Sequence, residues 1–177
     1  MHSVDYGGAI GLLQYLLYIT HPDIAFAVGQ FASFTFDPGV VHWNAMKHLF
    51  RYIQDSIDFG ITYSPDSSTS KLFSTFSDVN HSGCKDFEWS TGTYVVKIGT
   101  GVVSWMLKCQ PIVAMLTTEA EYVAACKAGK EIVWMCKLMQ ELGFKAQGPS
   151  TLHMDNKSAI QVVKHPEHYG QMKHLDL

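Results

Sequence analysis

The longest run of helical periodicity covers residues 117–143. On a helical wheel one side of this run is apolar and another side is charged. The apolar side holds Ala125, Ala128, Ile132, Met135, Met139 and Leu142, and the charged side holds Glu119, Lys130, Lys137 and Glu141. The pattern predicts an amphipathic helix with Thr118 as its N-cap and Leu142-Gly143 as its C-terminal stop.

Glu121 is the unusual residue of this helix, because the wheel aligns it with the apolar side. Two interpretations are open. Thr118-Glu119-Ala120-Glu121 fits a capping box, in which Glu121 would accept a hydrogen bond from a free backbone N–H. Alternatively, Glu121 faces other carboxylates across a metal site at the edge of the core. The spacing within the helix fits both.

The first 55 residues show helical periodicity only. Apolar residues recur at helical intervals over residues 6–20, 22–34 and 41–55, which predicts three helices. Pro22 suits the first turn of the second helix, where the missing N–H would have no partner. This part of the chain is therefore predicted to be a small all-helical segment.

The pattern then changes to one that is typical of strands. Residues 59–63 predict a short strand, and residues 64–70, which read Ser-Pro-Asp-Ser-Ser-Thr-Ser, predict a linker. We therefore divide the chain into a helical segment, residues 1–63, and a second domain, residues 71–177.

The second domain opens with strands. Residues 71–77 predict a strand that ends at Asp78, just before a turn rich in Asn, His, Ser and Gly. Residues 91–98 and 102–107 are two more β-branched runs, and Gly99-Thr100-Gly101 between them is a hairpin signal. Three consecutive antiparallel strands are expected.

The long helix is followed by one more strand and one more helix. Residues 150–154 predict a strand that ends at Asp155, and Asn156 opens a helix that ends near Lys164. Three antiparallel strands, a helix, a parallel strand and a helix indicate an α/β fold with a mixed sheet.

Composition narrows the possible functions. The 177 residues are 47% hydrophobic, which is ample for a core, and the net charge is −3 with Arg51 as the single arginine. A dedicated nucleic-acid binder would be strongly basic. The apolar run from Gly8 to Ile19 is too short to span a bilayer, and Asp5 precedes it, so we expect no signal peptide, no membrane segment and an intracellular location, cytoplasmic or nuclear.

Three carboxylates are candidates for a shared metal site. Asp78 and Asp155 each end a predicted strand, and parallel pairing would bring both to one edge of the sheet, where Glu121 could join them. Mg²⁺ or Mn²⁺ would offset their repulsion, and two such ions about 4 Å apart would support phosphodiester hydrolysis. Structural alternatives remain open: Asp78 could form an Asx turn and Asp155 could cap the following helix.

Five segments carry a family resemblance in their order and spacing. They are Phe76-Ser-Asp-Val-Asn-His-Ser-Gly, Ser90-Thr-Gly-Thr-Tyr-Val, Val103-Ser-Trp-Met-Leu-Lys-Cys-Gln-Pro-Ile-Val-Ala, Thr117-Thr-Glu-Ala-Glu-Tyr-Val-Ala and Met154-Asp-Asn-Lys-Ser-Ala-Ile. Together they resemble the ribonuclease H domain of copia-type LTR retrotransposon Pol polyproteins. Residues 1–63 resemble the stretch that follows the polymerase palm, at the end of the reverse transcriptase region.

The resemblance implies a ribonuclease H-like fold and a two-metal endonuclease that cuts the RNA strand of an RNA/DNA hybrid. Asp78, Glu121 and Asp155 match the first three acids of that family, which bind Mg²⁺ or Mn²⁺. Glu121 is preferred to Glu119 because Ala120-Glu121-Tyr122 matches the family's Ala-Glu-aromatic motif. Other parts of a Pol polyprotein are the implied partners.

The chain also departs from the family pattern. Asn80 and His81 replace the usual Asp and Trp, Glu88-Trp89 replaces a basic pair, and Gln171-Met172-Lys173-His174 replaces a more basic segment. The family's fourth acid lies beyond the matched region, so we expect a C-terminally truncated domain with impaired catalysis. The alternative is a non-catalytic retrotransposon remnant with at most weak nucleic-acid binding.

Overall fold

The computed structural model describes residues 4–65, 71–84, 89–110, 114, 116–144 and 148–165. The chain divides into two compact units, Met1–Ile61 and Thr62–Leu177. Among the described residues, no helix combines the length and the apolar character needed to cross a membrane. Glu88 and residues 171–176, where the sequence departs from the family pattern, lie outside the described residues.

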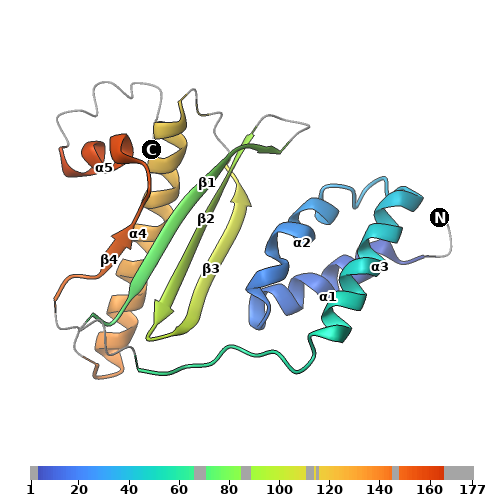
Figure 1. Cartoon of the computed structure of the whole chain (residues 1–177), viewed down its shortest axis with the longest axis horizontal. Coiled ribbons are helices and arrows are strands. Elements are labelled where there is room, and N and C mark those ends of the chain that lie inside the picture. Colours follow the sequence, from blue (N-terminus) through green and yellow to red (C-terminus); the bar gives the residue numbers. More distant parts are fainter. Residues whose placement is uncertain are drawn as a thin grey trace. The chain divides into compact units, whose positions relative to one another are not determined.

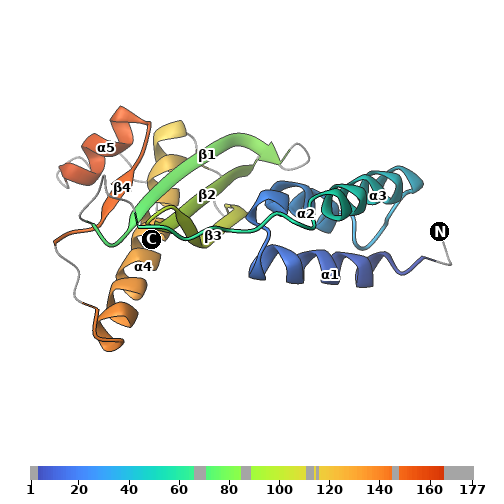
Figure 2. The ribbon, with the colours of Figure 1, turned by 60° about the horizontal axis from the view of Figure 1, so that its bottom comes forward.

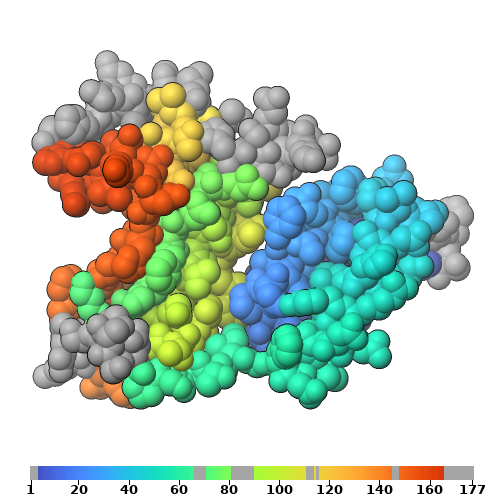
Figure 3. All heavy atoms as spheres, viewed as in Figure 1, coloured from blue at the N-terminus to red at the C-terminus, as the bar shows by residue number. Residues whose placement is uncertain are grey.

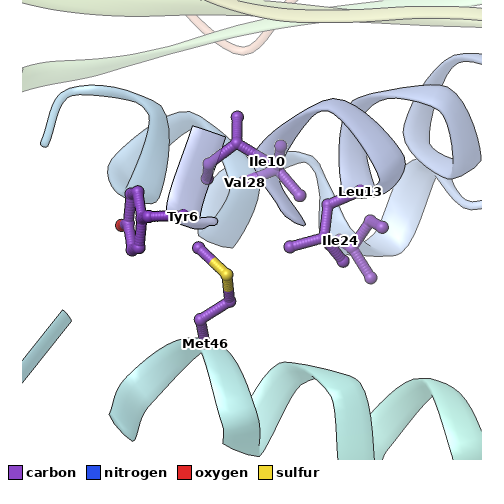
Figure 4. Packing of buried hydrophobic residues seen from close by; sticks show 6 residues of the cluster. All are labelled: Tyr6, Ile10, Leu13, Ile24, Val28 and Met46. Atoms are coloured by element: carbon purple, nitrogen blue, oxygen red, sulfur yellow. The ribbon is translucent and has the colours of Figure 1, made fainter. Parts of the chain in front are cut away.

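The first unit consists of helices, as the sequence predicts. These are α1 (Tyr6–Ile19), the short 3-10 helix η1 (Pro22–Ile24), α2 (Ala25–Ala32) and α3 (Val40–Asp55). Asp5 caps α1, because its Oδ1 accepts a hydrogen bond of 2.8 Å from the backbone N–H of Gly8. Side chains from all four helices point toward one another in a small core, which comprises Tyr6, Ile10, Leu13, Ile24, Val28 and Met46 (Figure 4).

The second unit is a mixed sheet with helices. Its elements are β1 (Ser74–Cys84), β2 (Trp89–Ile98), β3 (Gly101–Cys109), α4 (Thr117–Glu141), β4 (Thr151–His153) and α5 (Lys157–Lys164). The strand order is β3-β2-β1-β4; β1, β2 and β3 pair antiparallel, and β4 pairs parallel with β1. The helix α4 packs against β1 and β2 on one face of the sheet (Figures 1 and 2). The predicted mixed α/β sheet is confirmed.

Alanines allow α4 to approach the sheet closely. The buried residues of this face are Ala120, Ala124, Ala125 and Ala128. Ala128 lies in a core cluster with Phe73, the residue just before β1. The helix ends as predicted: Gly143 has φ +86°, its N–H donates to Gln140 O, and Phe144 N–H donates to Met139 O. This pair of bonds is a Schellman motif, in which glycine adopts the left-handed backbone at low cost.

The prediction of a strand at residues 59–63 is wrong. Residues 62–64 instead follow the β2–β3 turn, where Thr100 N–H donates to Ser64 O and Ser64 N–H donates to Thr100 Oγ1, both at 3.1 Å. The hydroxyl of Tyr63 donates to Val102 O at 2.8 Å. Because these bonds go to a turn and to a side chain, no regular ladder forms. An alanine at position 101 would force the Tyr63 ring to shift, since its Cβ would clash with that ring.

The predicted end of β1 at Asp78 is also wrong. The strand continues to Cys84, because β2 extends beside it: Asp78 pairs with Thr93, Asn80 with Thr91 and Cys84 with Trp89. The polar residues after Asp78 favoured a turn, but the backbone pairing with β2 overrides their local preference. Asp78 therefore lies in the middle of a strand.

Candidate metal centre

Three carboxylates from three different elements meet in the second unit. Asp78 lies in β1, Glu121 in the first turns of α4, and Asp155 between β4 and α5; one oxygen of each lies within 4.8 Å of those of the others. In the space-filling view, β1, α5 and the start of α4 border the same part of the surface (Figure 3). The structure thus brings together all three acids that the sequence singled out.

The register of the sheet explains why the two aspartates meet. Phe76 of β1 pairs with His153 of β4 in the parallel ladder. Asp78 lies two residues after Phe76, and Asp155 lies two residues after His153. The two aspartates therefore reach the same level along the direction of the paired strands. The strand β4 ends at His153, so the expectation of an acid beyond a strand end holds for Asp155 only, while Asp78 reaches the site from within β1.

Neighbouring residues perform the capping that sequence reasoning had assigned to Glu121 and Asp155. The helix α4 begins at Thr117 with Leu116 as its N-cap residue, and Leu116 N–H donates to Glu119 Oε2 at 3.4 Å. Thr118 is therefore not the cap, and Glu121 is not part of a capping box. Glu119 is buried, although the wheel placed it on the charged side.

Asn156 caps α5, because its Oδ1 accepts a bond of 3.0 Å from Ala159 N–H. Asp155 is therefore not needed as a cap. The Asx-turn interpretation of Asp78 is wrong as well: its Oδ1 accepts from the N–H of the next residue, Val79, at 2.8 Å, whereas an Asx turn reaches two residues onward. All three alternative structural roles thus fail for these acids.

Glu121 is the electrostatically strained member of the cluster. It is 4% exposed, and among the described residues its Oε2 is one of the buried side-chain oxygens with no hydrogen-bond partner. Burial, and after it the negative charges of Asp155 and Asp78, together raise the pKa of Glu121 from its ordinary value of 4.5 to about 7. Asp78 and Asp155 are exposed. A buried carboxylate beside two others is unfavourable unless a proton or a cation neutralises it.

The donor set fits a hard divalent cation. All three ligands are carboxylate oxygens, which Mg²⁺, Mn²⁺ and Ca²⁺ prefer, and no sulfur or imidazole ligand belongs to the described cluster. Two oxygens on one Mg²⁺ lie at most about 4.2 Å apart, and on one Ca²⁺ about 5 Å apart. A spread of up to 4.8 Å therefore needs at most a small closure of the side chains. The unpaired Glu121 Oε2 is the atom that such a cation would satisfy.

Gln110 positions Glu121, and sequence reasoning missed it. This side chain is fully buried, and its Nε2 donates to Ala120 O at 2.9 Å, which fixes the backbone beside Glu121. Gly92 makes room for the amide, since an added Cβ would lie 3.1 Å from Gln110 Nε2 and 3.5 Å from Ala124 Cβ. A glycine inside a β-branched strand was the available signal for a close approach of this kind.

Sheet and acids together define a mixed α/β module with a candidate site for divalent cations. The chain is homologous over nearly its whole length to a segment of the Pol polyproteins of copia-type retrotransposons. It is 35% identical over all of its residues to the Pol polyprotein of transposon TNT 1-94 from Nicotiana tabacum, and 34% identical over 98% of its residues to that of transposon RE2 from Arabidopsis thaliana. The family predicted from the sequence is thus confirmed.

The extent of these matches differs between relatives. The chain spans 13% of the TNT 1-94 polyprotein and 12% of the RE2 polyprotein. It is also 38% identical, over 76% of its residues and 94% of the relative's length, to a protein of Plasmopara viticola named secreted RxLR effector protein 161. No protein-family model matches the chain, and no solved structure matches it.

Proposed function

We propose that the second unit is a ribonuclease H-type nuclease module, in which Asp78, Glu121 and Asp155 bind divalent cations and direct the hydrolysis of the RNA strand of an RNA/DNA hybrid. The observation that carries the proposal is the convergence of these three carboxylates within 4.8 Å, with the buried Glu121 Oε2 left unpaired. Homology to copia-type Pol polyproteins supports the same assignment.

The order of the elements supports a ribonuclease H-like fold as part of this proposal. Three antiparallel strands, the helix α4, the parallel strand β4 and the helix α5 follow one another as the resemblance implies. Each acid then comes from the element that the family uses for it: Asp78 from the first strand, Glu121 from the first helix and Asp155 from the end of the fourth strand.

Each acid has a distinct task in the proposed reaction. Mg²⁺ or Mn²⁺, when bound, acidifies a water molecule and neutralises the charge on the leaving oxygen of the phosphodiester. Glu121 is held rigidly by the buried start of α4, so it fixes the position of the cation relative to the sheet. Asp78 and Asp155 are exposed and are the ligands that face an incoming phosphate.

The proposed substrate and partners follow from the family. The RNA/DNA hybrid is the substrate that the resemblance implies, and the remaining parts of a Pol polyprotein are the proposed neighbours of this module. Since the chain spans about an eighth of the polyproteins that it matches, these regions would contribute surfaces of their own to substrate binding.

The direct test is cleavage of an end-labelled RNA/DNA hybrid by the purified chain in Mg²⁺. We expect cleavage by the wild type, none in EDTA and none by Asp78→Asn, whereas Glu141→Gln, an exposed acid at the far end of α4, serves as the matched control and cleaves normally. Equal cleavage by the wild type and Asp78→Asn would refute the assignment, since the activity would not depend on the acids.

The second candidate function is a non-catalytic retrotransposon remnant. Asn80 and His81 stand where the family carries Asp and Trp, and the described cluster supplies three acids where the family uses four. In that case Mg²⁺ raises the melting temperature of the wild type but not of Asp78→Asn, and neither protein cleaves the hybrid. Thermal unfolding with and without Mg²⁺ therefore separates metal binding from catalysis.

A further inference from the structure

The side chain of Gln110 joins the sheet to the helix that carries Glu121. Gln110 directly follows β3, and its backbone N–H donates to Ser90 O of β2 at 2.8 Å. Its side-chain Nε2 donates to Ala120 O of α4 at 2.9 Å. One residue therefore connects the backbone of β2 to the backbone of α4 by two hydrogen bonds.

The bond to Ala120 acts directly on Glu121. The carbonyl of Ala120 and the N–H of Glu121 belong to the same peptide group, which is planar and rigid. Holding Ala120 O thus fixes the position of the Glu121 Cα relative to β2. Asp78 is tied to β2 as well, because it pairs with Thr93 in the β1–β2 ladder. Glu121 and Asp78 are therefore positioned against the same strand.

The apolar contacts of α4 resist sliding along the sheet only weakly. Packed helices commonly make small sliding movements, and single methyl groups interlock little with the strands beneath them. Such methyl groups form much of the buried face of the helix, at Ala124, Ala125 and Ala128. Another bond to the sheet, from Ser104 Oγ to Glu131 Oε1 at 2.7 Å, lies ten residues beyond Glu121 and runs through a longer side chain. The Gln110 amide is therefore the directional contact next to the acid.

The Gln110 amide is also an unfavourable group to bury, which indicates a role beyond stability. The side chain is fully buried, and in the described part of the chain its Oε1 has no hydrogen-bond partner. An apolar side chain of similar size would avoid this loss of stability. Ala120 O does not need the amide either, because a carbonyl within an α-helix accepts from the N–H four residues on. What the amide adds is a fixed position for the first turns of α4.

We propose that Gln110 is a positioning residue of the metal centre, which sets the affinity for Mg²⁺ by fixing where Glu121 lies relative to the two aspartates. This inference rests on the proposed function and deepens it, because it names a residue that controls cation binding at that site. A ligand held in place beforehand does not have to be ordered when the cation binds. Mg²⁺ accepts a narrow range of octahedral geometries, whereas Ca²⁺ accepts irregular ones. Loss of the amide therefore weakens Mg²⁺ binding more than Ca²⁺ binding.

The test compares cation binding with stability in the full chain. Mg²⁺ and Ca²⁺ are titrated separately at pH 8, and each affinity is obtained from the rise of the melting temperature with cation concentration. Gln110→Met keeps the length and bulk of the side chain and removes the amide. We expect about tenfold weaker Mg²⁺ binding, at the lower end of the roughly 10- to 100-fold effects of residues that orient metal ligands. The loss for Ca²⁺ is expected to be smaller, and the cation-free melting temperature is expected to stay close to that of the wild type.

Two further variants separate positioning from a general loosening of the fold. Gly92→Ala keeps Gln110 but places a Cβ 3.1 Å from its Nε2. The amide then has to shift, so Mg²⁺ binding is expected to weaken in this variant as well. Ser104→Ala is the matched control, because it removes the hydrogen bond to Glu131 and is expected to leave both cation affinities unchanged.

Several outcomes would overturn the positioning role of Gln110. An unchanged Mg²⁺ affinity in Gln110→Met would do so, and so would an equal loss in Ser104→Ala. Equal losses for Mg²⁺ and Ca²⁺, or a large fall in the cation-free melting temperature of Gln110→Met, would assign the amide to the stability of the fold. No stabilisation of the wild type by Mg²⁺ would refute the metal centre and the positioning role together. Normal stabilisation of both the wild type and Gln110→Met would refute the positioning role alone, so the two proposals are distinguishable.

Discussion

Replacing Glu121 by glutamine is expected to stabilise the cation-free protein at neutral and alkaline pH. Glutamine keeps the shape of the side chain and removes a charge that is buried beside Asp155 and Asp78. In the folded protein, burial and these two charges raise the pKa of Glu121 from its ordinary value of 4.5 to about 7. Folding therefore favours the protonated form of this side chain.

The sign and the pH range follow from this pKa. Between about pH 4.5 and 7 the folded protein binds more protons at Glu121 than the unfolded chain, so the wild type loses stability as the pH rises through this range. Above pH 7 the full cost is present, and below about 4.5 it vanishes. The Glu121→Gln variant has no such titration, so its advantage over the wild type grows with pH and then levels off.

The magnitude is set by the same two values. A rise from 4.5 to about 7 corresponds to about 3.4 kcal/mol at 1.36 kcal/mol per pH unit. Asp78 and Asp155 are exposed, and solvent screens their share of the repulsion, so about 2 kcal/mol is the realistic gain. For a chain of this size the gain raises the melting temperature by about 4–8 °C.

The assay is thermal unfolding of both proteins in EDTA, over a series of buffers from about pH 4.5 to 8.5. Glu141→Gln serves as the control and is expected to follow the wild type, because Glu141 is exposed. Adding Mg²⁺ at pH 8 is expected to stabilise the wild type more than Glu121→Gln. A difference between wild type and variant that is constant across this pH range would refute the reasoning, since the charge of Glu121 would then not be the cause.

Two further predictions concern the local structure around the sheet and the site. Gly101→Ala is expected to destabilise the second unit by about 1–3 kcal/mol in urea unfolding, because its Cβ would lie 2.1 Å from the Tyr63 ring. The control is Gly129→Ala, in open space on α4, which is expected to stabilise the second unit by about 0.5–1 kcal/mol. Equal effects of the two substitutions would contradict the close packing of Tyr63. Asn156→Ala is expected to lower the free energy of unfolding by about 1 kcal/mol through loss of the α5 cap. Asp155→Asn is expected to abolish stabilisation by Mg²⁺ without this loss of cation-free stability. A larger loss of cation-free stability in Asp155→Asn would mean that Asp155 does act as a cap.

Hydrophobic periodicity over several helical turns was the most reliable predictor of secondary structure in this sequence. The three N-terminal helices and the apolar stripe of α4 are confirmed, except that Leu142 at the end of the stripe is exposed, because burial of one face repeats over several turns and outweighs any single residue. The convergence of the acids could be argued from strand ends and a helix between them, without any knowledge of distances. The family resemblance then identified Glu121, and not Glu119, as the acid of the cluster.

Local signals were less reliable where tertiary contacts compete with them. The polar run after Asp78 indicated a turn, yet pairing with β2 extends the strand. The Thr118 pattern indicated a capping box, yet the N-cap residue is Leu116, two residues earlier, and its N–H donates to Glu119. The contact between Gln110 and Ala120 and the stack of Phe76 on His153 depend on the register of strands distant in sequence, which no local pattern specifies.

The short ladder between β1 and β4 has a consequence for the order of folding. It consists of the pairs Ser74–Thr151, Thr75–Leu152 and Phe76–His153, which join residues 77 positions apart in the chain. The hairpins of β1, β2 and β3 close much shorter loops, so they are expected to form first, and the β4 pairing last. Since this pairing brings Asp155 to the acid cluster, the proposed binding of Mg²⁺ would be a kinetic marker of the final step. In a stopped-flow refolding experiment, the phase accelerated or stabilised by Mg²⁺ would be the docking of β4.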